Sequence, residues 1–349
     1  MYVVVMVGRF GIGFTGAPLS VGGMIRYVNL AEKSGFESAW VAEDYFLRDA
    51  VSPLACFALA TKRIKVAFGV INPYSRNPAV IAETIATIDE LSRGRAILAL
   101  GTGVPPLIEQ MGIEFERPLS TIRESAHVIR ELLTGKEVTF QGSAINLKNV
   151  TLGVNPYFLL LKRFKPIRSN IPIYIAAIGP KMLQLAGEIG DGVLLTAACS
   201  SQYVKYAVEN IKVGAEKAGR DPAKIDVAAI ILYSVSRNGR PNDAVRGFLS
   251  YSLSYSNPEY LRMGGFDETE IEPIKEALEK KGMLEASKLV TDAMVDTHAA
   301  AGTPDRCREK LEEYKSAGVT LPIIFTMGTN TGMAIKTIGE YITQDEKDK

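Results

Sequence analysis

Continuous apolar runs alternate with amphipathic segments along most of this chain. Residues 64–103 show the pattern: an apolar run, an Asn/Pro turn, an amphipathic segment and a second apolar run that ends in three residues, Gly-Thr-Gly. Apolar runs without polar alternation are typical of strands covered on both faces, and two such strands joined by a helix are parallel. Because ligands bind beyond the carboxyl ends of such strands, the sequence predicts functional chemistry at residues 69–77 and 101–106.

The same pattern predicts eight strands, two of them within residues 64–103. The other six are expected at residues 3–7, 38–42, 172–178, 192–196, 225–234 and 321–326. Helices are expected between them, starting near residues 21, 52, 120, 180, 202, 304 and 333, with Ser52 as an N-cap. Residues 8–20 and 102–119 are predicted to be loops, and residues 138–147 a hairpin that turns at Gln141-Gly142.

Eight strands that alternate with helices to the end of the chain predict a (β/α)8 TIM barrel. A doubly wound open sheet is the alternative, and the steady alternation favours closure. We expect a single domain over residues 1–349, with insertions near residues 150–168 and 242–290. The apolar run YFLLL at residues 157–161 is expected to pack on the barrel or on another subunit.

Composition and charge narrow the function classes. The 349 residues carry a net charge of +1, which argues against nucleic acid as the main partner. The three cysteines, Cys56, Cys199 and Cys307, lack metal-ligand spacing, so we expect no metal site and a reducing, cytoplasmic location. The apolar N-terminus is interpreted as a strand, and no run reaches the roughly 18 apolar residues of a membrane span.

Two adjacent carboxylates, Glu43 and Asp44, end the second predicted strand. Neighbouring acids push their pKa values apart, which suits acid/base catalysis, so these two residues are the candidate catalytic groups. The structural alternative is that one of them caps the following helix or pairs with Arg48. Neither of the two histidines fits a catalytic cluster: His127 and His298 are expected to be structural.

Glycines mark the ends of the third and fourth strands. Gly69-Val70 precedes Asn72, where glycine could release the backbone into a bulge or simply end the strand. Gly101-Thr102-Gly103 could allow the close approach of a flat ring, or form a bare turn.

Gly179-Pro180 opens a helix directly after the fifth strand. The free N–H groups of a helix start bind anions, Lys181 adds positive charge, and Thr196 could add a hydroxyl from the next strand. The alternative is that Pro180 only occupies the first position of the helix, where proline is common, and that the segment binds no ligand.

Several segments in this order resemble one known family. They are INPYSRNPAVIAETIATIDELSRGRAILALGTG, RPLSTIRES, IPIYIAAIGPKMLQLAGEIGDGVLL and AGTPDRCREKLEEYKSAGV. The chain is similar to the bacterial-luciferase-like superfamily, and within it to the coenzyme F420-dependent methylenetetrahydromethanopterin reductases. The resemblance implies hydride transfer between a bound deazaflavin and an electrophilic carbon of a small, pterin-type substrate, in a homodimer or higher homo-oligomer.

The resemblance also implies where the cofactor lies. The ring would be backed by a non-prolyl cis peptide at Gly69-Val70, close to Asn72, with Gly101, Thr102 and Gly103 leaving room beside it. Contacts with the phosphate and tail would involve two alanines, a helix start and a hydroxyl: Ala176, Ala177, Gly179, Pro180 and Thr196.

The chain departs from this family at three proton-handling positions. Asp44 stands where histidine is usual, Val104 stands where an acid often follows the strand-four glycines, and YVVVMVG lacks the expected glutamate. Two other hypotheses therefore accompany the F420 reductase: an FMN-dependent luciferase-like monooxygenase, and a non-catalytic cofactor-binding homologue.

Overall fold

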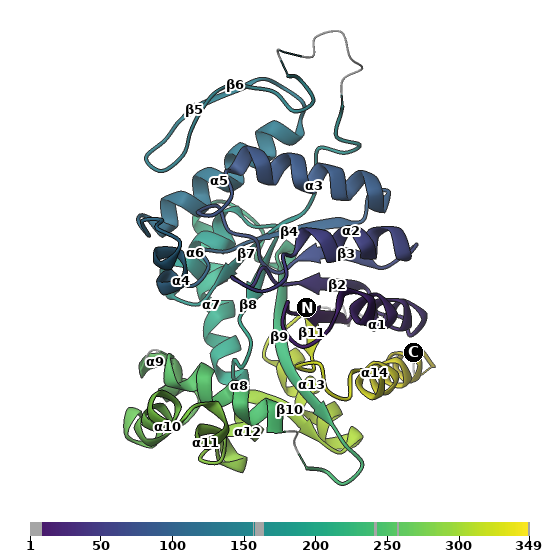
Figure 1. Cartoon of the computed structure of the whole chain (residues 1–349), viewed down its shortest axis with the longest axis vertical. Helices are drawn as coiled ribbons and strands as arrows, with labels where there is room; N and C mark the ends of the chain where they lie inside the picture. Colours follow the sequence, from purple (N-terminus) through teal and green to yellow (C-terminus); the bar gives the residue numbers. More distant parts are fainter. Residues whose placement is uncertain (1–8, 156, 158–163, 241–242, 257, 348–349) are drawn as a thin grey trace.

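The computed structural model describes residues 9–155, 157, 164–240, 243–256 and 258–347. Eight parallel strands close into a barrel, which confirms the predicted (β/α)8 fold (Figure 1). In barrel order they are β1 Gly11–Phe14, β2 Ser38–Val41, β3 Lys65–Phe68, β4 Ala96–Leu100, β7 Ile173–Ala177, β8 Gly192–Leu195, β9 Asp226–Val235 and β11 Leu321–Phe325.

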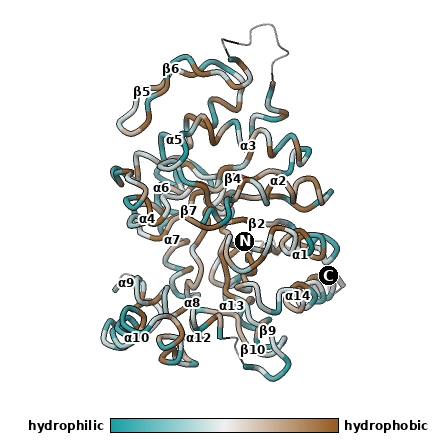
Figure 2. Tube along the Cα trace, viewed as in Figure 1, coloured by the Kyte–Doolittle hydropathy of each residue, from teal (hydrophilic) through white to brown (hydrophobic). Residues whose placement is uncertain are grey.

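Helices cover the outside of the barrel. They are α1 Val21–Lys33, α2 Val51–Ala60, α3 Pro78–Ser92, α5 Pro118–Leu133, α6 Pro180–Ile189, α7 Ser201–Lys217, α13 Pro304–Ser316 and α14 Thr331–Lys347. One large apolar cluster fills the layer between strands and helices, and a smaller one, which includes Trp40, Tyr174 and Ile323, fills the barrel interior. Figure 2 shows hydrophobic residues gathered along the central strands. Among the described residues, no helix is long and apolar enough to cross a membrane.

The first described strand of the barrel lies in a segment that was predicted to be a loop. Residues 3–7 lie outside the described part of the chain, and β1 falls within residues 8–20, which were predicted to be a loop. The glycines of this segment reflect crowding in the barrel. A Cβ atom at Gly11 would lie 3.0 Å from side-chain atoms of Ile323, Ser38 and Trp40. Glycine at position 11 therefore allows the strands to pack closely, although the glycines of this segment led to the prediction of a loop.

Three helix boundaries also differ from prediction. A short helix, α4 Pro105–Gln110, lies inside the predicted loop 102–119, and α5 begins at Pro118 rather than near residue 120. In both helices a proline occupies the first turn, where its missing N–H costs no hydrogen bond. Ser52 is not an N-cap: its N–H donates to Asp49 at 2.8 Å, and α2 has already begun at residue 51.

The predicted hairpin is present as β5 Val138–Gln141 and β6 Asn146–Val150. In the turn of this hairpin, the backbone N–H groups of residues 143–145 donate hydrogen bonds to the Glu124 carboxylate. Most of the apolar run at 157–161 lies outside the described residues; Tyr157 itself is 90% exposed.

The insertion at 242–290 is helical, as predicted. Its helices are α8 Asp243–Ser254, α9 Pro258–Met263, α10 Glu268–Lys281 and α11 Met283–Ser287, and the predicted break at Gly264-Gly265 follows α9. Beyond it, α12 Asp292–His298 leads into a short strand, β10 Ala299–Gly302, which pairs with the end of β9 and was not predicted. Figure 1 shows these helices below the barrel in one group, and their apolar cluster includes Phe325 at the end of β11.

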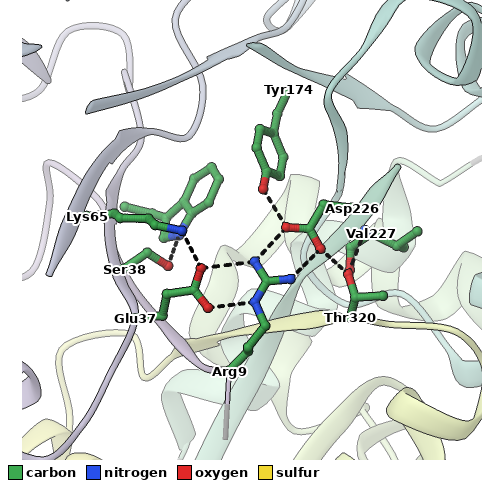
Figure 3. Close-up of polar contacts among 9 residues, drawn as sticks. Arg9, Glu37, Ser38, Lys65, Tyr174, Asp226, Val227 and Thr320 are labelled. Carbon is green, nitrogen blue, oxygen red and sulfur yellow. Dashed lines mark hydrogen bonds and ion pairs between the residues drawn. The ribbon is translucent and has the colours of Figure 1, made fainter. Parts of the chain in front are cut away.

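An ion-pair network closes the end of the barrel where the strands begin (Figure 3). Arg9 pairs with Glu37 at 2.6 Å and with Asp226 at 2.7 Å, and Asp226 also accepts hydrogen bonds from Tyr174 and Thr320. Burial opposes the ionisation of both carboxyl groups. The hydrogen bonds and positive charge of Arg9 outweigh it, so the pKa values of Glu37 and Asp226 are lowered.

We expect the free energy of unfolding to fall as the pH drops below about 5. A carboxylate whose pKa is lower in the folded chain contributes its full stability above the unfolded pKa and loses it as the pH falls through the folded value. The lowered pKa values of Glu37 and Asp226 place this loss on the acid side. Urea unfolding between pH 7 and pH 3 measures it. Equal pH dependence in wild type and Arg9→Met would show that the network is not its source.

Candidate active site

A cavity of about 460 Å³ opens at the other end of the barrel, where the strands end. Its floor includes barrel side chains such as Trp40, Ile230 and Ile323. Its walls are mostly apolar side chains from the strand ends, the following loops and α8: Phe14, Leu47, Val104, Leu107, Phe248, Tyr251, Phe325 and Met327. A mostly apolar cavity with few polar groups is typical of a site for a small organic ligand.

The predicted site residues divide into two groups. Those that line the cavity are Glu43, Asp44, Gly69, Val70, Asn72, Gly103 and Thr196. Those that do not line it are Gly101, Thr102, Ala176, Ala177, Gly179 and Pro180. The strand-end rule therefore brings the β2, β3 and β4 residues together, while the residues around the start of α6 lie to one side.

The peptide bond between Gly69 and Val70 is cis, as the resemblance implied. The carbonyl of Val70 accepts a hydrogen bond from the N–H of Glu43 at 3.1 Å. After this peptide the chain rejoins the sheet, where Ile71 donates to Ala99 at 3.0 Å and accepts from Gly101 at 3.1 Å. The backbone on both sides of the peptide is thus tied to the neighbouring strands β2 and β4.

Gly101 supports Val70 from behind the cavity wall. A Cβ atom at this position would lie 2.8 Å from Cγ2 of Val70 and 3.2 Å from Cβ of Ala176. Because Gly101 has no side chain, Val70 can pack against its backbone. Gly101 therefore affects the cavity indirectly, through the position of Val70.

We expect Gly101→Ala to lower the free energy of unfolding by about 1–3 kcal/mol, because the added methyl group overpacks this contact. Denaturant unfolding measures the change. Gly22→Ala is the matched comparison, since a Cβ atom at this position in α1 meets nothing within 4 Å and alanine favours a helix, so stability should not fall. Equal stability of the two variants would contradict this explanation.

Glu43 lines the cavity, and one of its two carboxylate oxygens has no hydrogen-bond partner among the described residues. Its Oε1 accepts a hydrogen bond from Nε of Arg76 at 2.9 Å and forms an ion pair with Nη2 of the same residue at 2.8 Å. Its Oε2 is buried, and no hydrogen-bond partner among the described residues reaches it. A buried acceptor without a partner costs free energy unless a ligand satisfies it, so this oxygen is a candidate contact for a bound molecule.

Asp44 is held by the loop before α1. Its Oδ2 accepts from the N–H of Gly16 at 2.9 Å, while Arg48 donates to the carbonyl oxygen of Gly16 at 2.6 Å. Among the described residues, neither Glu43 nor Asp44 caps α2 or pairs with Arg48. The structural alternative given for these two acids is therefore wrong.

Tyr45 and Asn72 add a second polar feature. The Asn72 side-chain amide donates to the Tyr45 hydroxyl oxygen. Burial, together with the charges of Glu43 and Asp44, raises the pKa of Tyr45 to about 12. Gly103 has a positive φ of 75°, and a side chain at this position would collide with the Tyr45 hydroxyl.

The start of α6 is open to solvent. Gly179 is its N-cap without a side-chain hydrogen bond, Pro180 occupies N1, and a Cβ atom at Gly179 would meet nothing within 4 Å. The N–H groups of the first turn are thus available to an anion. Pro180 also occupies the first position of the helix, so both interpretations of this segment agree with the structure.

The remaining candidate groups are structural or absent from the site. His298 is buried with Nδ1 2.8 Å from the carbonyl oxygen of Ala198, and burial lowers its pKa to about 4. His127 lies against Phe140 with ring centres 5.4 Å apart. Within the described ranges, no group of three or more His, Cys, Asp or Glu side chains could hold a metal ion.

Several residues of the cavity were missed by sequence reasoning. Tyr45 directly follows the acid pair, so its position gave a usable signal. Arg76 contacts Glu43 without lining the cavity, and its place in the Asn/Pro turn gave a similar signal. Phe248 and Tyr251 come from the 242–290 insertion, and nothing in its local pattern indicates that α8 reaches the barrel mouth.

Comparison with known proteins identifies relatives over most of the chain. Two proteins named 5,10-methylenetetrahydromethanopterin reductase, from Methanolobus tindarius and Archaeoglobus fulgidus, are each 38% identical. Each alignment covers 90% of this chain, with 94% and 93% of the respective relatives. The solved structure of the coenzyme F420-dependent tetrahydromethanopterin reductase from Methanopyrus kandleri superposes with a TM-score of 0.87 at 30% identity, covering 97% of this chain and 99% of that one.

The family model described as luciferase-like monooxygenase matches residues 2–321, which include seven of the eight barrel strands and the first residue of the eighth, β11. This match agrees with the closed barrel and with the cis peptide after β3. The chain therefore belongs to the luciferase-like monooxygenase family.

Proposed function

We propose that this protein is an F420-dependent oxidoreductase that transfers a hydride between the deazaflavin and an electrophilic carbon, as a methylenetetrahydromethanopterin reductase. The names of the relatives at 38% identity support the reaction and the pterin-type substrate. The observation that carries the proposal is the mostly apolar cavity at the strand ends, which the two acids Glu43 and Asp44 line.

The residues of the cavity fit a flat heterocycle. Gly103 makes room for the Tyr45 hydroxyl, and Gly101 makes room for the Val70 side chain, so both of these side chains can line the cavity. When bound, F420 supplies the ring carbon that donates or accepts the hydride. Val70 would support the ring, and the apolar side chains from α8 and β11 would exclude water from the reacting atoms.

The start of α6 would hold the anionic part of the cofactor. Gly179 and Pro180 begin this helix, Ala176 and Ala177 end β7 before it, and Thr196 follows β8 and lines the cavity. The open N–H groups of the helix start provide the positive potential that a phosphate requires.

Glu43 and Asp44 are the proposed acid/base groups. Glu43 is the better placed, because Arg76 fixes one oxygen and leaves Oε2 free to hold or move a proton. Asp44 lines the same cavity but is held by Gly16. We assign Glu43 the proton transfer and Asp44 the orientation of the loop that carries it.

The direct test is to mix the purified protein with reduced F420 and methylenetetrahydromethanopterin without oxygen and to follow the cofactor absorbance. We expect substrate-dependent oxidation of F420. A panel of alcohols and sugar phosphates in the opposite direction tests the substrate class. Failure to bind F420 would overturn the proposal.

The FMN-dependent monooxygenase remains the second candidate, because the matching family is described by that activity. A yellow protein with a flavin spectrum and substrate-dependent oxygen consumption would favour it. Binding of F420 without any turnover would favour the non-catalytic homologue, for which Val104 at the cavity rim is the motivating feature.

We further propose that the whole chain acts as one domain, in the cytoplasm, as a homodimer or higher homo-oligomer, with no nucleic-acid or membrane partner. The net charge of +1 supports the last point. The exposure of Tyr157 beside the insertion supports self-association, which light scattering tests.

A further inference from the structure

Asn72 holds Tyr45 in a hydrogen bond whose direction is determined. Asn72 is only 1% exposed, and its Oδ1 accepts from the N–H groups of Tyr74 at 3.0 Å and Ser75 at 2.8 Å. These two contacts require the oxygen of the amide to face the turn, so the amide nitrogen must face Tyr45. Because that nitrogen can only donate, the Tyr45 oxygen is the acceptor in this bond.

The proton of the Tyr45 hydroxyl is therefore left for another acceptor. Among the described residues, no acceptor receives it. The pKa of about 12 keeps the group protonated at neutral pH. Tyr45 lines the cavity together with Glu43 and Gly103, and its hydroxyl takes the space that a side chain at Gly103 would occupy.

We propose that Tyr45 donates this hydrogen bond to a carbonyl oxygen or an unprotonated ring nitrogen of the heterocycle in the cavity, and that Asn72 is the positioning residue that makes Tyr45 a donor. The inference rests on the proposed function, since the deazaflavin and the pterin both carry such acceptors. It assigns to the site a neutral recognition group that is distinct from the proton-transfer role of Glu43.

The first test is Tyr45→Phe, which removes the hydroxyl and keeps the ring. Two constants are measured on the full-length protein: the Kd of F420 by spectroscopic titration, and the KM of methylenetetrahydromethanopterin. We expect one of them to rise about tenfold, because a ligand acceptor in an apolar cavity loses its partner. The constant that rises identifies which molecule Tyr45 contacts.

Tyr74→Phe is the matched control. Its hydroxyl already donates to the carbonyl oxygen of Glu116 at 2.6 Å, and Tyr74 does not line the cavity. Removing this hydroxyl should leave the Kd and the KM within about twofold of wild type, since the lost bond lies within the protein. A tenfold change in this control would attribute the effect to loop structure and contradict the inference.

The second test is Asn72→Asp, which keeps both acceptor contacts of the turn and replaces the donor by a carboxylate oxygen. The carboxylate would take the Tyr45 proton for itself. We expect the same constant to rise as in Tyr45→Phe. We also expect the double variant to be no more than about twofold worse than the poorer single variant, because both changes remove one hydrogen bond. Independent structural damage would instead multiply the two losses.

The outcomes separate this inference from the proposed function. If wild type binds F420 and turns over, but Tyr45→Phe changes neither constant by more than about twofold, the inference is wrong and the function stands. If wild type binds FMN instead, the same titration with FMN decides, because its ring carries the same kinds of acceptor. If wild type binds neither F420 nor FMN, both the function and the inference fail.

Discussion

Glu43→Gln should lower kcat by about 10²–10⁴-fold, the usual contribution of a positioned acid/base group. Glutamine is close in size and can still accept from Arg76, so the cavity should keep its shape. What it loses is the ionisable oxygen, Oε2, which is buried without a partner. Stopped-flow oxidation of reduced F420 with methylenetetrahydromethanopterin measures the change, while the Kd of F420 should stay within a few-fold of wild type.

Asp44→Asn is the informative comparison, because both acids end the same strand and line the same cavity. The Asp44 carboxylate accepts from Gly16, a contact that an amide oxygen can also make, so this variant should retain most of its turnover. A larger loss in Asp44→Asn than in Glu43→Gln would reverse the assignment. Full turnover in both variants would show that neither residue carries the proton.

Arg9→Met should lower the free energy of unfolding by about 3–5 kcal/mol, since it leaves partly buried carboxylates without their cation. Arg9 is 18% exposed and joins Glu37 to Asp226 across the strand starts (Figure 3). Removing the guanidinium leaves Asp226 without its ion pair, whereas Glu37 keeps its pair with the half-exposed Lys65. Thermal and urea unfolding measure the loss.

Arg306→Met is the matched control for this network. Arg306 also pairs with two carboxylates, Asp296 and Glu309, but it lies on the surface at 40% exposure. Solvent screening should limit its effect to less than about 1 kcal/mol. If Arg9→Met and Arg306→Met lower the free energy of unfolding equally, the Arg9 network stabilises the protein no more than a surface ion pair does. Because the network lies at the opposite end from the cavity, Arg9→Met should retain its Kd for F420 at low temperature.

The sequence alone determined the architecture and the neighbourhood of the site. Apolar runs that alternate with amphipathic segments require parallel strands covered by helices, since each run must be buried on both faces. Strand ends in such a fold meet at one edge, so Glu43, Val70 and Gly103 could be placed together from their positions after three different strands. Local periodicity and the strand-end rule are sufficient for this much.

Tertiary structure decided which atoms meet. The sequence around Gly11 predicts a loop, but this residue lies in a strand because it pairs with β2 and β11 in the closed barrel. Ile323 and Trp40 leave little room for a side chain there, which explains the glycine. Arg9 and Asp226 are 217 residues apart and meet only when the barrel closes.

The direction of the Tyr45 hydrogen bond likewise follows from the turn that fixes Asn72. Hydrophobic periodicity specifies which residues are buried, but contacts between distant side chains and the direction of a hydrogen bond depend on three-dimensional position. Only the folded chain sets that position.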